Sequence, residues 1–305
     1  MSKYSINNEL NAIYSQLRFE AEQDLDSRLQ DALKNPEFKS LYTKRKAVGL
    51  ELTKKQSNEL KEEYKKLSQQ LLAVIEKNNI DLNIYHKCPK CKDTGYINGI
   101  PCECRLKLSK RLLRAESKLP KFATTTFEDS KFSTLNVKQA KKMEGIYKDC
   151  KRWAENIDNA SKRIIYLMGG VGTGKTTLSF CIANKLIENG HSVYFATAFD
   201  LSNLIIEKQF NRLQNIDDYY NMLDADLLII DDLGTEPQNT LMQEGLFAIL
   251  DSRINNNKKT VICTNLTEAQ FAKRYGERSL SRLTSASFAY KPSYIDGDDL
   301  RKIKC

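Results

Sequence analysis

A glycine-rich loop between an apolar run and a helical pattern constrains this chain more than any other feature. Residues 163–189 read RIIYLMGGVGTGKTTLSFCIANKLIEN, in which Gly169 and Gly174-Lys175-Thr176 fit the pattern G-x-x-x-x-G-K-[ST]. The run IIYLM before the loop is typical of a buried strand. After the loop, apolar residues recur at helical spacing at Leu178, Cys181, Ile182 and Leu186. Strand, loop and helix together predict a P-loop, which places phosphates at a helix N-terminus.

The chemistry of phosphate binding explains the residue types in this loop. Glycines let the backbone bend tightly around phosphate oxygens and direct N–H groups inward. Lys175 is expected to reach the β- and γ-phosphates of ATP, and the Thr176 hydroxyl to coordinate Mg²⁺. The predicted nucleotide-binding residues are Gly169, Gly170, Val171, Gly172, Thr173, Gly174, Lys175, Thr176 and Thr177.

A second apolar run ends in two carboxylates. Residues 227–232 read LLIIDD, the Walker B pattern, in which a strand carries Asp231 to the sheet edge that faces the P-loop. There Asp231 can hold Mg²⁺, and Asp232 can polarise the attacking water as general base. Many ATPases have Glu at the second position. Because Asp is one methylene shorter, we expect Mg²⁺-dependent ATP hydrolysis that is slow without a partner.

Strands and helices alternate through the second half of the chain. VYFA at 193–196 and TVICT at 260–264 read as strands, and 198–212 and 244–256 as helices. This alternation predicts an α/β fold, a three-layer sandwich with a parallel sheet and its ligand at the carboxyl ends of the strands. Asn265 follows the strand TVICT, beside Walker B, and is expected to position water or sense the γ-phosphate.

Four of the eight cysteines form two close pairs. Residues 88–105 read CPKCKDTGYINGIPCECR, so Cys88 and Cys91 precede Cys102 and Cys104 across a glycine-containing hairpin. Two such pairs can close a tetrahedral Zn²⁺ site, whose role would be structural because protein fills all four positions. A redox C-x-x-C is the alternative, but no βαβ pattern surrounds it. His86, beside the first pair, is interpreted as a bystander.

The first 85 residues show helical periodicity. Apolar positions on one face are Leu10, Ile13, Tyr14, Leu17, Ala21, Leu25, Leu29 and Leu33. Asn35-Pro36 breaks this pattern, and a heptad seam begins at residue 60. A helical hairpin or small bundle is predicted, serving either as a scaffold or as a partner-docking module. Together with the cysteine knuckle it forms a predicted domain at 1–105, followed by a basic linker at 106–125 and an ATPase domain at 126–305.

Net charge and hydropathy indicate which partners and which cellular location to expect. The 305 residues include 48 Lys+Arg and 39 Asp+Glu, a net charge of +9. This excess favours a polyanionic partner such as nucleic acid, although solvated helical faces explain it equally well. No apolar run is long enough to span a membrane, and the N-terminus does not resemble a signal peptide. A soluble, cytoplasmic protein with no membrane partner is expected.

Several of these motifs together resemble a known family. GGVGTGKT, LLIIDDLGTE, VICTN, GERSLSRL and a late Arg301 resemble the AAA+ helicase loaders of the DnaC/DnaI family and the related IstB-type transposition helpers. The resemblance covers about residues 120–305. The knuckle CPKCKDTGY…CEC behind a helical region looks like the zinc-bearing loaders of the DnaI side.

The resemblance implies roles for individual residues. Asn265 would be sensor 1 and Arg301 sensor 2. Arg282 would be the arginine finger that reaches a neighbouring subunit's γ-phosphate, with Arg278 as the competing candidate. Phe127 would lie near the adenine.

The same resemblance implies partners. The expected function is ATP-dependent loading of a hexameric replicative DNA helicase, which the N-terminal domain would bind. The ATPase domain would bind single-stranded DNA and self-associate through its ATP sites. Candidate DNA contacts are Phe210, Arg212, Tyr219 and Tyr220. Two alternatives stay open: an IstB-like transposition helper that binds duplex DNA, and an ATP-binding adaptor with negligible turnover.

Overall fold

The structure is a computed structural model that describes residues 3–55, 57–130, 137–210, 216–287, 289–290 and 293–295. The chain divides into two compact units. The smaller unit is Glu9–Arg105, and the larger unit is Leu106–Cys305 together with Met1–Asn8. The predicted linker, 106–125, falls within the larger unit.

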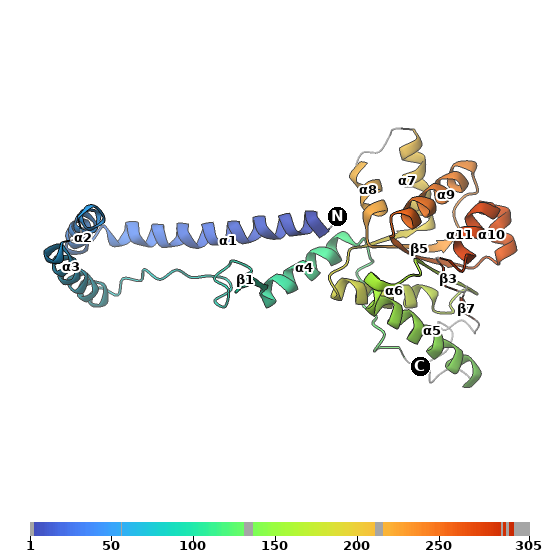
Figure 1. Ribbon diagram of the computed structural model, residues 1–305, viewed down its shortest axis with the longest axis horizontal. Coiled ribbons are helices and arrows are strands. Elements are labelled where there is room, and N and C mark those ends of the chain that lie inside the picture. Colours follow the sequence, from blue (N-terminus) through green and yellow to red (C-terminus); the bar gives the residue numbers. More distant parts are fainter. Residues whose placement is uncertain are drawn as a thin grey trace. The chain divides into compact units, whose positions relative to one another are not determined.

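Helices dominate the smaller unit, drawn in blue to teal in Figure 1. They are α1 (Lys3–Ala32), most of which belongs to this unit, α2 (Pro36–Lys54) and α3 (Asn58–Lys77). The apolar periodicity of residues 10–33 ends before Asn35, because the side chain of Asn35 caps the next helix, α2. It accepts hydrogen bonds from the N–H groups of Glu37 and Phe38. Phe38 packs with Leu71 and Val74 where α2 and α3 meet. The predicted helical N-terminal region is confirmed, and within it the hairpin is formed by α2 and α3.

The cysteine knuckle contains a short antiparallel hairpin, β1 (Tyr96–Ile97) and β2 (Ile100–Pro101). Asn98 and Gly99 both have positive φ, the conformation that a two-residue hairpin turn of this hand requires. The next helix, α4 (Glu103–Glu116), begins inside the second cysteine pair.

A five-stranded parallel sheet forms the centre of the larger unit. Its order is β4-β5-β6-β3-β7, so β6 lies between the P-loop strand β3 and the Walker B strand β5. The tip of β6 is therefore brought between the two motifs. The strands are β3 (Ile164–Gly169), β4 (Val193–Thr197), β5 (Leu227–Leu233), β6 (Lys259–Thr264) and β7 (Ser293–Ile295).

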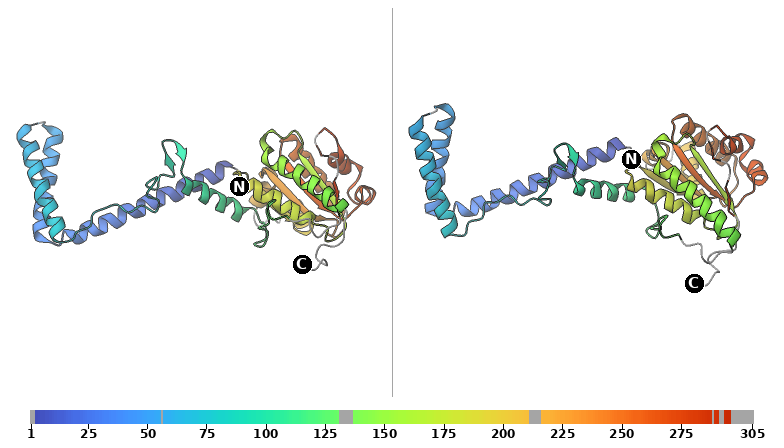
Figure 2. Two further views of the ribbon diagram at one scale, coloured as in Figure 1. Left: turned by 90° about the horizontal axis from the view of Figure 1, so that it is seen from below. Right: turned by 60° about the horizontal axis from the view of Figure 1, so that its bottom comes forward.

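Helices cover both faces of this sheet, which makes three layers (Figure 2). On one face lie α5 (Val137–Glu155) and α6 (Lys175–Glu188). The other face packs against α7 (Ala198–Gln209), α8 (Ile216–Asp224), α9 (Thr240–Asn255), α10 (Glu268–Tyr275) and α11 (Glu277–Thr284). A short 3₁₀ turn, Ile157–Asn159, precedes β3.

The predicted α/β fold, with a parallel sheet behind a helical N-terminal region, is confirmed. Residues along the strands alternate between the two helical layers, and both layers are apolar. Helix α9 begins at Thr240, four residues before the predicted start, because Asn239 caps it through the N–H of Met242. Among the described residues, no helix is both long and apolar enough to cross a membrane.

Candidate functional site

The glycine loop joins β3 directly to α6, and three of its glycines have positive φ. Gly172 and Gly174 have φ of 74° and 93°, and Gly174 stands immediately before the helix. At Gly169 a Cβ would lie 2.2 Å from the carbonyl oxygen of Ile295, so the neighbouring strand β7 excludes any side chain there. The loop conformation thus depends on glycine.

Lys175 is buried at the start of α6, and its ammonium group contacts both the loop and the neighbouring strand. Nζ donates to the carbonyl oxygens of Gly169 at 2.9 Å and Gly170 at 2.6 Å. It also donates to Oδ1 of Asn265, the residue after β6, at 2.7 Å. The structure therefore brings the predicted sensor 1 residue into direct contact with the P-loop lysine.

The Walker B carboxylate contacts the P-loop threonine. Thr176 Oγ1 donates to both carboxylate oxygens of Asp231, each at 3.0 Å. Burial, reinforced by the charge of Asp232, raises the pKa of Asp231. Asp232 itself is exposed and has a φ of 52°, a left-handed conformation that Asp tolerates better than most residues. A hydroxyl and a carboxylate in this position fit the oxygen ligands that Mg²⁺ prefers.

Lys175, Thr176, Asp232 and Asn265 line one cavity of about 330 Å³, whereas Asp231 is not among its lining residues. Its polar walls combine loop residues with side chains from the ends of β5 and β6, at the carboxyl edge of the sheet. The lining residues are Val171, Gly172, Thr173, Gly174, Lys175, Thr176, Thr177, Asp232, Thr235 and Asn265. Seven of the nine predicted loop residues line it, as does the predicted general base.

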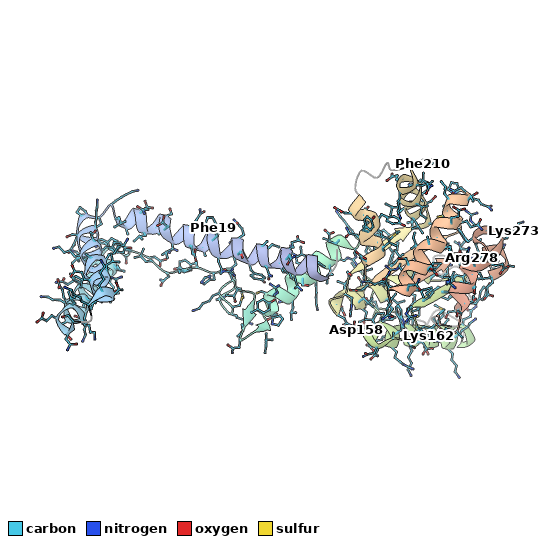
Figure 3. All side chains as sticks on the ribbon, turned by 45° about the horizontal axis from the view of Figure 1, so that its top comes forward. Phe19, Asp158, Lys162, Phe210, Lys273 and Arg278 are labelled. Atoms are coloured by element: carbon cyan, nitrogen blue, oxygen red, sulfur yellow. The ribbon has the colours of Figure 1, made fainter. Side chains whose placement is uncertain are left out.

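Among the described residues, several predicted ones do not line this cavity: Gly169, Gly170, Asp231, Phe127, Arg278 and Arg282. Phe127 packs edge-on against Tyr147 of α5, with ring centroids 6.2 Å apart. Arg278, labelled in Figure 3, has its guanidinium 4.4 Å from the ring centroid of Phe247. Arg301 lies outside the described residues.

Arg282 pairs with a carboxylate on α9 of the same chain. Its Nε and Nη2 donate to one oxygen of Asp251, at 3.0 and 2.7 Å. The side chains of both residues are about one third exposed. Because neither finger candidate lines its own chain's cavity, a role in catalysis would require a second subunit.

A buried carboxylate beyond Walker B escaped the sequence prediction. Glu236, 3 % exposed, accepts from the N–H of Gly234 at 3.0 Å and from Nε of Arg274 at 3.3 Å. Tyr275 also donates to it, and burial together with this carboxylate raises the pKa of the Tyr275 phenol. The contacts tie the loop after Asp232 to α10. In the sequence, the one sign of this buried carboxylate is the acidic residue of the segment LGTE. That segment looks like many exposed turns, so its burial could not be predicted.

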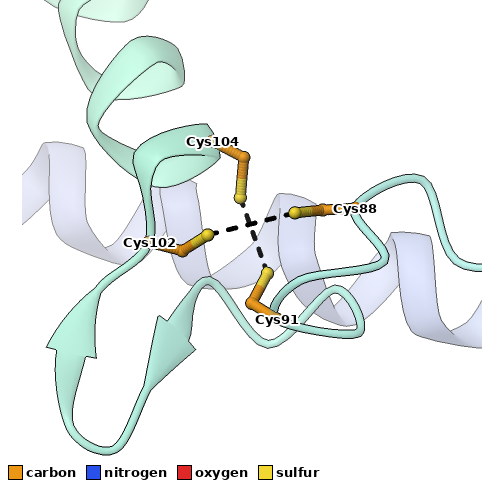
Figure 4. A group of neighbouring side chains, drawn as sticks. All are labelled: Cys88, Cys91, Cys102 and Cys104. Carbon is orange, nitrogen blue, oxygen red and sulfur yellow. Dashed lines mark hydrogen bonds between the residues drawn. The ribbon is translucent and has the colours of Figure 1, made fainter.

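The four knuckle cysteines form one cluster, shown in Figure 4. Their sulfur atoms lie within 4.8 Å of one another, with Cys88 to Cys102 at 3.9 Å and Cys91 to Cys104 at 3.5 Å. Tetrahedral Zn–S bonds of about 2.3 Å require sulfur atoms about 3.8 Å apart, whereas a disulfide requires about 2.05 Å. The cluster thus fits a Cys₄ zinc site.

The thiols of this cluster differ in how readily they ionise. A hydrogen bond from the backbone N–H of Cys91 lowers the pKa of Cys88 to about 7, whereas burial raises that of Cys104 to about 12. Four thiolates this close together would repel one another without a cation between them. His86 is not part of the cluster; its Nδ1 lies 3.4 Å from a carboxylate oxygen of Asp93.

The candidate DNA contacts separate into exposed and buried residues. Phe210, at the end of α7 (Figure 3), is 54 % exposed, and Tyr220 is 51 % exposed. Tyr219 is buried among the core residues under α7 and α9, so its prediction as a surface stacking residue is wrong. The helix periodicity turns Tyr219 inward and Tyr220 outward. Arg212 lies outside the described residues.

A glycine loop at a helix N-terminus, a buried lysine and an adjacent aspartate–threonine pair define a P-loop nucleotide-binding protein. Comparison with known proteins identifies a family within this class. Residues 104–287 match the family described as IstB-like ATP binding protein, which is more than half of the chain. The chain therefore belongs to the IstB-like ATP-binding protein family.

Curated relatives match about half of the chain. The replicative helicase loader DnaC of Buchnera aphidicola subsp. Schizaphis graminum is 30 % identical over 142 residues, covering 45 % of this chain and 56 % of the relative. DnaC of Escherichia coli strain K12 is 26 % identical over 157 residues, covering 51 % and 63 %. The aligned segment thus spans less than two thirds of either relative.

A solved structure gives a similar match. The crystal structure of the DnaC helicase loader is 21 % identical, with a TM-score of 0.47 over 59 % of this chain and 100 % of that chain. The resemblance to DnaC/DnaI-type loaders and IstB, noted from the motifs, is confirmed by the family match and the curated relatives.

Proposed function

We propose that this chain is an ATP-dependent loader of the replicative DNA helicase, acting in the initiation or restart of DNA replication. The observation that supports it best is the contact of Lys175 with Asn265 and of Thr176 with Asp231, a P-loop site in a chain about half of which aligns with replicative helicase loaders. In this proposal residues 1–105 bind the helicase, and residues 126–305 bind ATP and single-stranded DNA. Residues 106–125 link these two domains.

The site supports Mg²⁺-dependent ATP hydrolysis. Lys175 exchanges its contacts with loop carbonyls for the β- and γ-phosphates. Thr176 and Asp231 are the residues that would hold Mg²⁺, which would supply positive charge to offset that of the phosphates. Asp232 takes the proton of the attacking water, and Asn265 orients that water from the tip of β6.

Self-association completes the site in this proposal. Arg282, or Arg278 in its place, enters the ATP site of a neighbouring subunit and stabilises the charge that develops on the γ-phosphate. Arg282 leaves Asp251 when it does so; that pair is partly exposed, and such pairs contribute only about 0–1 kcal/mol. Arg301 remains a proposed sensor 2, and Phe127 a proposed adenine contact.

Single-stranded DNA would bind the ATPase domain through exposed aromatic residues and positive charge. Phe210 and Tyr220 present their rings at the surface on α7 and α8, where bases could stack. Lys208, near the end of α7, lies with its ammonium 3.9 Å from the ring centroid of Tyr219 and adds positive charge beside them.

The family match favours one second candidate, an IstB-like transposition helper that binds duplex DNA. The two functions share the ATP site and differ in partner. Size-exclusion chromatography of the full chain with the replicative helicase of the same organism, with and without ATP, separates them. Co-migration that is lost when residues 1–105 are deleted supports the loader.

No complex with helicase under any nucleotide, together with tight duplex binding, would establish the helper instead. A helicase complex that forms with ATP while the protein hydrolyses none, even with DNA present, would identify the third alternative, an ATP-binding adaptor. Slow turnover in that assay is compatible with the shorter Asp232 in place of Glu.

A further inference from the structure

One face of α1 lies against the cysteine knuckle. Asn11, Tyr14 and Arg18 recur at intervals of three and four, the spacing of one helical face. Arg105 donates to Oδ1 of Asn11 at 2.9 Å, and Arg18 donates to the carbonyl oxygen of Asp93 at 2.9 Å. Between them the Tyr14 hydroxyl donates to Sγ of Cys104 at 3.1 Å. All these residues belong to the smaller unit.

Packing holds the Tyr14 hydroxyl in this position. The residue is 3 % exposed, and its ring lies so close to Gly95 that a Cβ there would approach within 3.0 Å. Gly95 also has a φ of 76°, which favours glycine. The Arg105 guanidinium lies 5.7 Å from the ring centroid of Tyr14 and 4.5 Å from that of Tyr96. The phenol is thus directed at the cluster by its surroundings.

The chemistry of a loaded cluster explains why these groups lie here. Four thiolates around one Zn²⁺ leave a net charge of −2, which is costly to bury. The Tyr14 hydroxyl donates to the sulfur of Cys104, and Arg105 is the next residue in sequence. The hydroxyl and the Arg105 guanidinium both offset that charge. A hydrogen bond to a thiolate is stronger than one to a thiol, since charged acceptors form stronger bonds. The contact between α1 and the knuckle therefore strengthens when metal is held.

We propose that Tyr14 is a positioning residue of the metal site, and that metal binding and the docking of residues 9–20 on the knuckle are coupled. The inference rests on the proposed zinc assignment. Metal binding favours the docked helix, and by thermodynamic linkage the docked helix raises metal affinity by the same factor. The metal then joins α1 to the knuckle through residue pairs that are 75 and 90 positions apart in sequence.

The first test compares metal affinity in the full-length chain. Zinc is withdrawn by a chromophoric chelator from the unmodified protein, from Tyr14→Phe and from the control Tyr85→Phe. Tyr85 is an exposed tyrosine of the same unit whose hydroxyl bonds to Asp81. Tyr14→Phe should weaken zinc binding on the order of tenfold, the usual effect of losing a group that bonds to a metal ligand. Tyr85→Phe should not change it.

Cobalt supplies an independent readout, since the sulfur-to-metal charge-transfer band of the Co²⁺-loaded protein reports on thiolate hydrogen bonding. That band should shift in Tyr14→Phe and not in Tyr85→Phe. Equal zinc affinity and equal bands in Tyr14→Phe and the unmodified protein would overturn the role of Tyr14.

The second test needs no variant. Hydrogen exchange of the unmodified protein is measured before and after zinc removal, and the amides of residues 9–20 should exchange faster without metal. Unchanged protection of those amides would overturn the coupling. A protein that binds neither zinc nor cobalt would instead remove the zinc assignment, so the two failures are distinguishable.

Discussion

Thr176 Oγ1 lies 3.0 Å from both carboxylate oxygens of Asp231, although the two residues are 55 positions apart in sequence. The contact joins the P-loop helix to the Walker B strand and places a buried carboxylate next to the Thr176 hydroxyl, which lines the cavity. These are the two side chains that we propose as Mg²⁺ ligands. The consequences of this arrangement can be measured.

Lys175→Ala should remove tight ATP binding, because the ammonium is the one side chain expected to bridge the terminal phosphates. Charge-assisted hydrogen bonds of this kind contribute about 1.5–3 kcal/mol each, so affinity should fall on the order of 100-fold by calorimetric titration. Lys185→Ala, farther along α6, is the matched control, since Lys185 pairs with Glu155 and Glu188. Binding within twofold of the unmodified protein would refute the P-loop assignment.

Asp231→Asn should stabilise the nucleotide-free protein at pH 7. Burial and the charge of Asp232 raise the pKa of Asp231 above its ordinary value of 3.8. When the pKa of a carboxyl is higher in the folded than in the unfolded protein, the free energy of unfolding decreases as pH rises from the unfolded-state pKa to the folded-state pKa. At neutral pH the carboxyl is ionised, and the folded protein is destabilised by the full amount. The variant should therefore have a higher Tm at pH 7, and the gain should vanish as pH falls to 3.8.

The same variant should lose ATP turnover, because Asn provides one neutral oxygen where Mg²⁺ needs a carboxylate. A steady-state assay should show at least a 100-fold decrease, on the scale of losing a charge-stabilising group. Asp232→Asn should also lose turnover but raise Tm less, since Asp232 is exposed. A lower Tm for Asp231→Asn at pH 7 would contradict the sign of this pKa shift.

Removing one knuckle cysteine should remove the metal. The unmodified chain should release about one zinc on denaturation, because a Cys₄ cluster holds one ion. Cys91→Ser should release none, whereas Cys150→Ser, a buried cysteine outside the cluster, should keep the full amount. A colorimetric chelator measures both. Equal zinc release from Cys91→Ser and the unmodified chain would show that the metal is held elsewhere.

Arg282→Ala should lower ATP turnover while ATP affinity stays within about twofold. An arginine finger contributes about 10³–10⁵ to the rate, so the loss should be large. Asp251→Asn is the control: it breaks the same intrachain pair but keeps the arginine. If Asp251→Asn lowers turnover as much as Arg282→Ala, the arginine acts within its own chain.

A mixing experiment tests whether the ATP site is shared between subunits. Lys175→Ala and Arg282→Ala are each expected to be inactive alone. Mixed together, they should regain part of the turnover, because some interfaces then combine an intact P-loop with an intact finger. If that mixture stays inactive but Lys175→Ala regains turnover when mixed with an inactive Arg278→Ala, Arg278 is the finger. If neither mixture regains turnover, the ATP site is not shared between subunits.

Local patterns of the amino-acid sequence were sufficient for the P-loop, the Walker B strand, the cysteine knuckle and the helical N-terminal region. Each is determined by neighbours in sequence: glycines at required backbone angles, apolar runs in strands, and pairs of thiols at a ligand spacing. The parallel sheet followed from the alternation of strands and helices, because parallel strands need such crossovers.

Only the tertiary structure decided which distant side chains meet. The position of β6 between β3 and β5 brings Asn265 to Lys175, and β7 makes Gly169 indispensable. Glu236 is buried only because α10 packs over the loop that carries it, and Tyr14 reaches Cys104 only because α1 lies against the knuckle. These contacts depend on strand order and on which helical face is covered, and neither is encoded in any single local pattern.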